Sequence, residues 1–411
     1  MLPDFESRLR TLADVIVRVG LNLQRGQRLL ITEPYELQGV ARSAELLVTA
    51  VQTAARDAGY RQSTRPEIIW GDGSRIREFA AKGDWAGYAR VVTANAAVMQ
   101  AAIDDGDALL FLQGSQPQLM AGIPAERVAE LRRLGWDCFG PIAQQLLSGT
   151  TNWTAVPAPS AGWADQVYAE LPAHGRLAAL WERVFAACRV GPLPPDATPG
   201  STRPAAPPHS ATAIQSWEMH LTALQNLRSR LNESRLTALH YAGAGTDLRV
   251  SLPPEHLWVS AQLKTTAGLP FVANLPTEEV FTLPHRDSAE GTVSVARPVS
   301  YGGATIEGII LEFHRGRVVR ATARTNATLL DQLLSEDEGA MRLGEVALAM
   351  PEVSWSHDGR NYHHSLLDEN TSNHIALGDA YGLCLRAPNA EAQNRSQIHL
   401  DLPIDATVAL P

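Results

Sequence analysis

The chain has 411 residues, which is more than one average hydrophobic core holds, so two domains are expected. Its composition is that of an ordinary globular protein, with 45% hydrophobic and 19% charged residues. The formal net charge of -9, with acids and bases interspersed, argues against a nucleic-acid partner, because such proteins usually carry a basic surface.

The first 190 residues alternate between helical and strand patterns. Apolar residues at Phe5, Leu9, Leu12 and Ile16 fall on one helical face, which predicts a first helix. Further helices are expected at residues 38–58, 93–104 and 126–134, and strands at residues 28–32, 67–70 and 108–112. Helices that alternate with strands are typical of parallel βαβ units, so residues 1–190 are predicted to form an α/β domain with a parallel sheet.

Motifs of common enzyme classes are missing from this half. No GxGxxG follows a strand, and the chain has neither a P-loop nor a GxSxG elbow, so nucleotide binding and serine hydrolysis lack their usual parts. Five aspartates of this half stand at positions typical of solvated turns and helix ends, namely Asp72, Asp84, Asp104, Asp105 and Asp107.

Residues 191–210 are the clearest change in composition. They include seven prolines in twenty residues and almost no bulky apolar side chain. Such a stretch cannot bury enough surface to offset the entropy of ordering, so residues 191–213 are predicted to be a linker or a long surface loop. A helix follows, with Trp217, Leu221, Leu224 and Leu231 on one face.

Residues 214–411 have the pattern of a strand-rich α+β domain. Strands are expected at residues 236–241, 247–252, 292–296, 305–313 and 318–323, separated by glycine-containing turns. Their close spacing predicts a largely antiparallel sheet or partial barrel. Helices are expected near residues 331–349 and near His374.

Four segments of this second domain concentrate side chains that ligate metals. Glu345 stands alone in an apolar surround, and such a carboxylate needs a partner or a cation. His399 and Asp401 are two residues apart, which on a strand places both side chains on one face. The other two segments carry Glu279, beside a second acid, and His374. Mixed carboxylate and imidazole ligation suits zinc, cobalt or manganese.

Each of these residues also has an ordinary explanation. Glu279 or Glu345 alone is more often a helix cap or an ion-pair partner, and His374 alone is more often a hydrogen-bonded core residue. The HLD motif at His399 occurs often by chance. A motif match without structural context is a hypothesis, so the spacing alone leaves the metal site open.

The same segments resemble the M29 family of metallo-aminopeptidases, of the thermophilic aminopeptidase type. The matching stretches are NLPTEEVFTLPHRDSAEGTV from residue 274, LGEVAL from residue 343, SLLDENTSNHIALGDAYG from residue 365 and HLD from residue 399. LNLQRGQRLLI from residue 21 and the region of residues 113–126 extend the resemblance into the N-terminal half. It covers most of the chain apart from residues 191–210.

The resemblance implies a metal site in the C-terminal domain and an aminopeptidase activity. It implies about two divalent ions per chain (zinc, cobalt or manganese) that activate a water, and a peptide substrate with a free N-terminus. It also implies a homodimer with enclosed active sites. The implied metal ligands are Glu279, Glu345, His374, His399 and Asp401, with Glu345 also accepting a proton and Tyr381 as the catalytic tyrosine. Glu279 is preferred to Glu278 on its interval from Glu345.

Two other functions remain open at this point. One is a catalytically inactive binding protein that retains the fold, and the other is a two-metal hydrolase of a non-peptide amide or ester. The presence of all the implied ligands argues against the first. Hydrolysis of an aminoacyl anilide but not of its N-acetylated counterpart would separate these readings from an aminopeptidase.

The expected compartment follows from cysteines and hydropathy. Cys138, Cys188 and Cys384 form no CxxC motif, and so sparse and odd a set is typical of a reducing compartment. The N-terminus has no apolar segment of the signal-peptide type, and no apolar run approaches the roughly 18 residues of a membrane span. A cytoplasmic protein without a membrane partner is expected.

Overall fold

The computed structural model describes residues 4–59, 67–114, 116, 118–191, 209–301, 304–350 and 359–409. The chain divides into two compact units: unit 1 comprises Met1–Thr222 and Gln262–Pro276, and unit 2 comprises Ala223–Ala261 and Thr277–Pro411. Residues 192–208 lie outside the described residues, so a linker there stays a prediction, but residues 209–213, expected in the same linker, already belong to the helix that begins at His209. Within the described part of the chain, no helix is long and apolar enough to cross a membrane.

Unit 1 is an α/β unit around a three-stranded sheet. Its elements are, in chain order, α1 (Phe5–Val15), β1 (Leu29–Thr32), α2 (Glu45–Asp57), α3 (Gly73–Lys82), α4 (Trp85–Asp104), β2 (Ala108–Gln113), α5 (Ala125–Leu147), β3 (Trp153–Pro157), α6 (Ala161–Val167), α7 (Ala173–Ala187), β7 (Gln262–Lys264) and β8 (Pro270–Val272). The helix α8 (His209–Ser234) begins in unit 1 and continues into unit 2.

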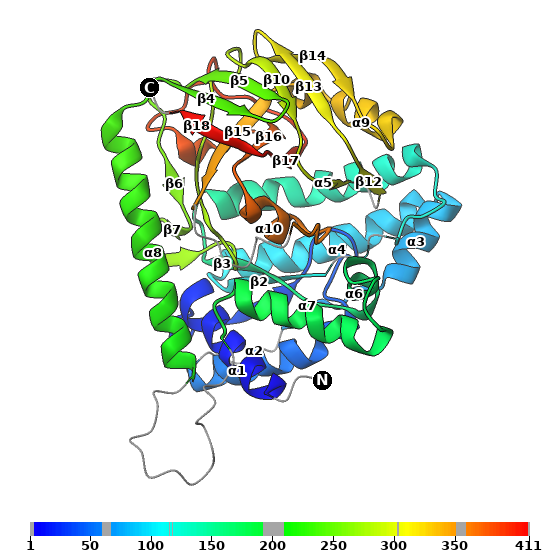
Figure 1. The fold of residues 1–411 in the computed structure, drawn as a ribbon. Coiled ribbons are helices and arrows are strands. Elements are labelled where there is room, and N and C mark those ends of the chain that lie inside the picture. The colour runs from blue at the N-terminus through cyan, green and yellow to red at the C-terminus, as the bar shows by residue number, and fades with distance from the viewer. Residues whose placement is uncertain are drawn as a thin grey trace. The chain divides into compact units, whose positions relative to one another are not determined.

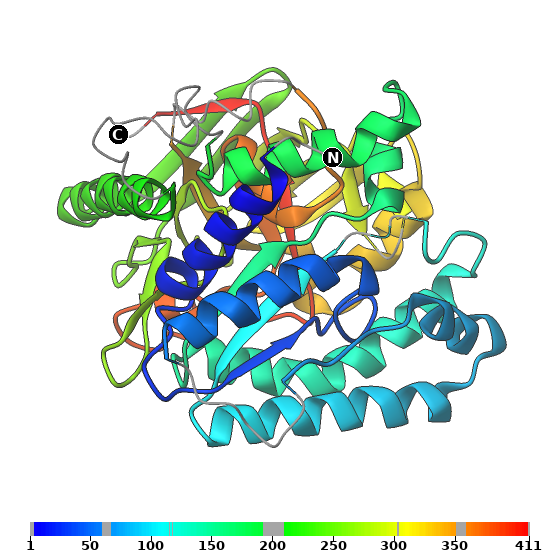
Figure 2. The same cartoon turned by 90° about the horizontal axis from the view of Figure 1, so that it is seen from below.

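The three-stranded sheet of unit 1 is parallel, in the order β1-β2-β3, and β7 and β8 form a separate antiparallel pair. Helices α1 and α2 lie on one side of it and α4 and α5 on the other (Figures 1 and 2). Because both faces are covered, β1 and β2 are runs of buried apolar residues rather than alternating ones. The α/β fold with a parallel sheet is therefore confirmed.

Several boundaries in unit 1 differ from the expected ones. α2 begins at Glu45 rather than at residue 38, and α4 begins at Trp85 rather than at residue 93. Residues 67–70 form two isolated parallel bridges instead of a regular strand, one from Ile68 to Ile31 of β1 and one from Trp70 to Val40. Asp72 and Asp84 are the N-caps of α3 and α4, with side chains that accept hydrogen bonds from the first turn, as their helix-end reading predicts.

Glu33, the residue after β1, is a buried acid with a raised pKa. Its carboxylate accepts hydrogen bonds from the backbone N–H groups of Tyr35 (2.7 Å) and Leu37 (3.2 Å). Burial, with a contribution from the charge of Glu36, raises its pKa from 4.5 to about 8. The folded state thus binds this proton more tightly than the unfolded state. The resulting stabilisation is complete below about pH 4.5 and is lost as the pH rises through about 8.

We expect the substitution Glu33→Gln to flatten this pH dependence. Urea titration gives the difference in the free energy of unfolding between the variant and wild type. This difference should shift in favour of the variant by on the order of 4 kcal/mol between about pH 5 and pH 9, at roughly 1.4 kcal/mol per pKa unit. Loss of one acceptor for a backbone N–H adds an offset that is the same at every pH. A stability difference that does not change with pH would contradict the raised pKa.

Unit 2 is strand-rich, and its described residues form two larger antiparallel sheets and one antiparallel pair of short strands, β11 with β12. Its elements are β4 (Ala238–Gly243), β5 (Thr246–Ser251), β6 (Val259–Ser260), β9 (Glu279–Thr282), β10 (Glu290–Ser294), β11 (Val299–Tyr301), β12 (Ala304–Ile306), β13 (Ile310–His314), β14 (Arg317–Thr322), α9 (Ala327–Leu334), β15 (Leu343–Ala349), α10 (Ser365–Asp368), β16 (His374–Gly378), β17 (His399–Pro403) and β18 (Ala406–Ala409). The six-stranded sheet has the strand order β14-β13-β10-β5-β4-β18, and the five-stranded sheet has the order β17-β16-β15-β9-β6.

The two larger sheets of unit 2 are linked through their backbones. The chain passes from β17 into β18, and Ile404 between them pairs with Val295, which follows β10. Elsewhere Arg317 of β14 pairs with Arg342, which precedes β15. The strand-rich α+β character expected of the C-terminal half is confirmed (Figure 1).

Three expectations for unit 2 differ from the structure. The helix expected over residues 331–349 ends at Leu334 as α9, and Leu343–Ala349 is the strand β15. Such a short, fully buried apolar run has no periodicity that separates a strand from a helix. The single strand expected over residues 305–313 is divided into β12 and β13 by Gly308, which adopts a φ of +62°. Near His374 the helix is the single turn α10, and His374 itself begins β16.

Candidate metal centre

The strands β16 and β17 bring three candidate residues to one face of the five-stranded sheet. On β16, His374, Ala376 and Gly378 alternate along the strand and so point to the same face. Asp401 lies opposite Ala376 and His399 lies opposite Gly378. Directly opposite residues of an antiparallel pair share a face, so both join His374 there. The HLD motif thus forms a strand with its imidazole and carboxylate on one side.

The neighbouring strands add two carboxylates to this face. Glu345 of β15 lies opposite Ala376. On the next strand, Glu279 of β9 lies opposite Ala349, which is four residues from Glu345 and therefore on the same face. The small side chains at the intervening positions leave space above the sheet for the longer acids.

A β-bulge sets the direction of Glu345. The register between β15 and β16 shifts between Leu343 and Glu345, so Gly344 is the extra residue. A Cβ atom at Gly344 would lie 2.3 Å from the carbonyl oxygen of Asp379 and 2.5 Å from that of Gly378. Only glycine fits this approach, and the bulge places Glu345 opposite Ala376, on the face of the other candidates.

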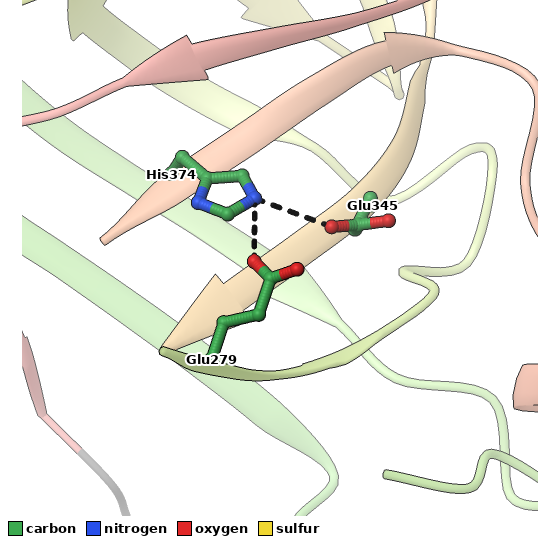
Figure 3. Close-up of side chains that lie close together, drawn as sticks. All are labelled: Glu279, Glu345 and His374. Carbon is green, nitrogen blue, oxygen red and sulfur yellow. Dashed lines mark hydrogen bonds and ion pairs between the residues drawn. The ribbon is translucent and has the colours of Figure 1, made fainter. Parts of the chain in front are cut away.

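His374 is the centre of the first group of side chains. Its Nε2 atom lies 3.0 Å from Oε2 of Glu279 and 3.3 Å from Oε1 of Glu345 (Figure 3). Burial alone would lower the pKa of His374, but the charges of Glu279 and Glu345 outweigh it and raise the pKa well above its usual value. One nitrogen therefore faces two carboxylates, although it can donate only one hydrogen bond.

His399 is the centre of the second group. Its Nε2 atom lies 3.3 Å from Oδ1 of Asp401 and 3.7 Å from Oε2 of Glu345. Its Nδ1 atom lies 2.8 Å from the carbonyl oxygen of Asp379, which can only accept, so Nδ1 carries the proton. In the neutral ring, Nε2 then presents a lone pair to two carboxylates, an arrangement that a cation stabilises.

The two groups share one carboxylate. Within the described residues, ligand atoms of Glu279, Glu345 and His374 lie within 4.8 Å of one another, and so do those of Glu345, His399 and Asp401. Glu345 turns one oxygen to each imidazole. A shared carboxylate of this kind can bridge two ions a few ångströms apart.

The residues present fit divalent cations. Oε2 of Glu279 is buried and makes no hydrogen bond among the described residues, although Nε2 of His374 is close. Burial raises the pKa of Glu345, because its charged form loses water among other acids. Without a cation, this buried set of acids must take up protons to limit its repulsion. Oxygen and imidazole donors together match zinc, cobalt or manganese.

Glu369 also belongs to this cluster, although it is not among the ligands predicted from the sequence. It lies in a single 3₁₀ turn, Glu369–Thr371, and its side chain is buried. Burial, with the charges of Asp401 and Glu279, raises the pKa of Glu369 well above its usual value. Burial opposes a low pKa of Asp401, but the charge and hydrogen bond of His399, helped by His374 and by a hydrogen bond from Glu369, lower it. Its place five residues before His374, in an acid-rich stretch, was the only signal in the sequence.

Tyr381 lies against the second group. Its ring stacks on His399 with centroids 4.6 Å apart and an interplanar angle of 29°. It also makes a T-shaped contact with the ring of Phe281, with centroids 6.1 Å apart. Of the two adjacent acids at the start of β9, Glu279 faces His374, and Glu278 is also buried. All the candidate residues of the sequence argument therefore lie in one neighbourhood of unit 2.

Comparisons with known proteins point to one family. A sequence model of the family described as thermophilic metalloprotease (M29) matches residues 5–408. The chain is 35% identical over 403 residues to aminopeptidase T of Thermus thermophilus, covering 97% of this chain and 92% of that protein. It is 31% identical over 411 residues to aminopeptidase AmpS of Bacillus subtilis, covering 98% of this chain and 93% of that protein.

A solved structure shows the same fold. Wild-type AmpT from Thermus thermophilus matches with a TM-score of 0.81 at 34% sequence identity, covering 99% of this chain and 98% of that chain. The similarity extends over nearly the whole length of both proteins.

Proposed function

Because the chain belongs to the M29 family of metalloproteases, we infer that it is a metal-dependent aminopeptidase that removes N-terminal residues from peptides. The observation that carries this proposal is the pair of ligand groups on one sheet face, joined by Glu345. Relatives named as aminopeptidases support the reaction type.

We further propose that the centre takes about two divalent cations, zinc, cobalt or manganese. Glu279, Glu345 and His374 would hold one of them, and Glu345, His399 and Asp401 the other. Glu369 would complete the set beside Asp401. When bound, such cations supply Lewis acidity, which polarises a peptide carbonyl, lowers the pKa of a water towards about 7 and binds a free α-amino group.

The side chains of the centre have distinct roles in this proposal. Glu345 faces both imidazoles and would accept the proton of the attacking water. The carbonyl of Asp379 keeps the proton of His399 on Nδ1 and so leaves Nε2 free to ligate. Tyr381, held against His399, would donate a hydrogen bond from its phenolic O–H to the oxyanion that develops on the substrate, or position the substrate.

Hydrolysis of model substrates tests the function. We expect the metal-loaded protein to hydrolyse leucyl-anilide and to leave N-acetyl-leucyl-anilide intact, because a blocked amine cannot bind a cation. Elemental analysis of the same sample should find about two divalent ions per chain. The double variant His399→Ala, Asp401→Ala should lose metal and activity together.

Other outcomes would identify the alternatives. Equal cleavage of the free and acetylated substrates would favour a hydrolase of other amides or esters. Protein that stays metal-free and inactive after addition of Zn²⁺, Co²⁺ or Mn²⁺ would leave an inactive relative with the same fold. A homodimer stays a prediction from the resemblance, and a cytoplasmic location stays a prediction from the cysteine content and hydropathy of the sequence.

A further inference from the structure

Asn370 has a fully buried side chain at the edge of the metal centre. It lies in the turn Glu369–Thr371, next to Glu369. Its Oδ1 atom accepts a hydrogen bond of 2.6 Å from the backbone N–H of Glu278. Its Nδ2 atom donates to the carbonyl of Leu366 at 3.0 Å and to Oε1 of Glu369 at 3.3 Å. Both ends of the amide are therefore engaged.

The bond to Glu278 fixes the start of β9. The carbonyl of Glu278 accepts a bond of 2.8 Å from the backbone N–H of Met350, just after β15. The peptide groups on both sides of Glu278 are thus held, one by Asn370 and the other by the neighbouring strand. Because the backbone direction of a strand decides where the next side chain points, this contact aims Glu279 at His374.

The bond to Glu369 holds the second acid. An amide N–H beside Oε1 orients that carboxyl group, and hydrogen bonds to ligating carboxylates tune metal sites. Glu279 and Glu369 come from segments 90 positions apart, yet the same amide contacts both neighbourhoods. An amide is the side chain that can accept at one end and donate at the other in this small space.

We propose that Asn370 is a positioning residue of the metal centre, which sets Glu279 and Glu369 for cation binding. This inference rests on the proposed metal-dependent function and extends it to a side chain that touches no cation. A purely structural asparagine would stabilise the fold equally with and without metal. A positioning asparagine changes the affinity for the cation itself.

Asn232 offers a matched control in the same unit. Its Oδ1 atom accepts from the backbone N–H of Trp258 at 3.0 Å, and its Nδ2 atom donates to the carbonyls of Trp258 and Arg228, each at 3.0 Å. It therefore makes as many hydrogen bonds as Asn370, but all of them are to backbone groups and none is to a carboxylate. Its hydrogen-bond partners, Arg228 and Trp258, are not candidate ligands.

The experiment measures Zn²⁺ affinity by competition with a chelator, and thermal unfolding with excess chelator and with Zn²⁺. For Asn370→Ala and Asn370→Ser we expect about 10- to 100-fold weaker Zn²⁺ binding. We also expect these variants to gain less thermal stability from Zn²⁺ than wild type. Asn232→Ala should unfold earlier in both conditions and keep wild-type affinity. The serine variant carries the test if the alanine variant does not fold.

The outcomes separate this inference from the proposed function. Wild-type affinity in the Asn370 variants overturns the positioning role and leaves the metal centre in place. Equal losses of affinity in the Asn370 and Asn232 variants make the effect one of general stability and also overturn it. Wild-type protein that binds no Zn²⁺, Co²⁺ or Mn²⁺ overturns the proposed function and this inference with it.

Discussion

Replacing Glu345 with glutamine is expected to abolish metal binding and peptide hydrolysis while leaving the protein folded. Glu345 is the carboxylate that both ligand groups share. Glutamine keeps its volume but removes its charge and one anionic oxygen. Because Lewis-acid stabilisation is worth several kcal/mol, and each 1.36 kcal/mol is tenfold in rate, leucyl-anilide hydrolysis should fall by about 10³-fold or more.

The stability of the metal-free protein distinguishes a loss of metal binding from unfolding of the variant. Burial raises the pKa of Glu345, so its charged form opposes folding when no cation is bound. The metal-free Glu345→Gln variant should therefore be at least as stable as metal-free wild type in thermal unfolding at neutral pH. Glu312→Gln, an exposed change on β13, is the control and should keep metal and activity. A Glu345→Gln variant that retains about two ions and full activity would refute the shared-ligand assignment.

The second large effect is expected from Gly344→Ala, which adds a single methyl group. The new Cβ atom would meet the backbone carbonyls of Asp379 and Gly378 at 2.3 and 2.5 Å, and no side-chain movement relieves this contact. Overpacking of this kind costs about 1–3 kcal/mol, and more where backbone must move. The carbonyl of Asp379 is the acceptor for His399, so the same displacement should disturb the imidazole.

Two measurements check this prediction. Thermal unfolding in chelator should show the loss of stability, and chelator competition should show weaker Zn²⁺ binding than in wild type. Gly175→Ala is a suitable control, because its Cβ would meet nothing within 4 Å and it lies in the helix α7. That change should stabilise by about 0.5–1 kcal/mol. Wild-type stability and affinity in Gly344→Ala would show that the bulge tolerates a side chain.

Local signals in the sequence were sufficient for some elements and were overlooked for others. The buried strands β1 and β2 were found from their apolar runs and flanking turns. The helix α3 was missed although its ends are marked by Asp72, which caps its N-terminus, and by Gly83, which ends it with a φ of +68°. These capping signals act within a few residues, so they were available without the fold.

The strand β15 shows where local reasoning fails. Its residues, LGEVALA, are buried along almost their whole length, so neither a two-residue nor a 3.6-residue period is visible. Pairing with β9 and β16 makes this segment a strand, and both partners are distant in sequence. The direction of the Glu345 side chain therefore depends on this pairing, which local sequence does not specify.

The sequence by itself determined the class of fold, the family and the set of candidate ligands, because these depend on composition, local periodicity and ordered motifs. The tertiary structure alone decided that Glu279, Glu345, His374, His399 and Asp401 share one sheet face, that Gly344 makes a bulge beside Glu345, and that Glu369 and Asn370 join them. The physical reason is register. A shift of one residue between strands turns every side chain to the other face, and that pairing is set by packing across the whole sheet.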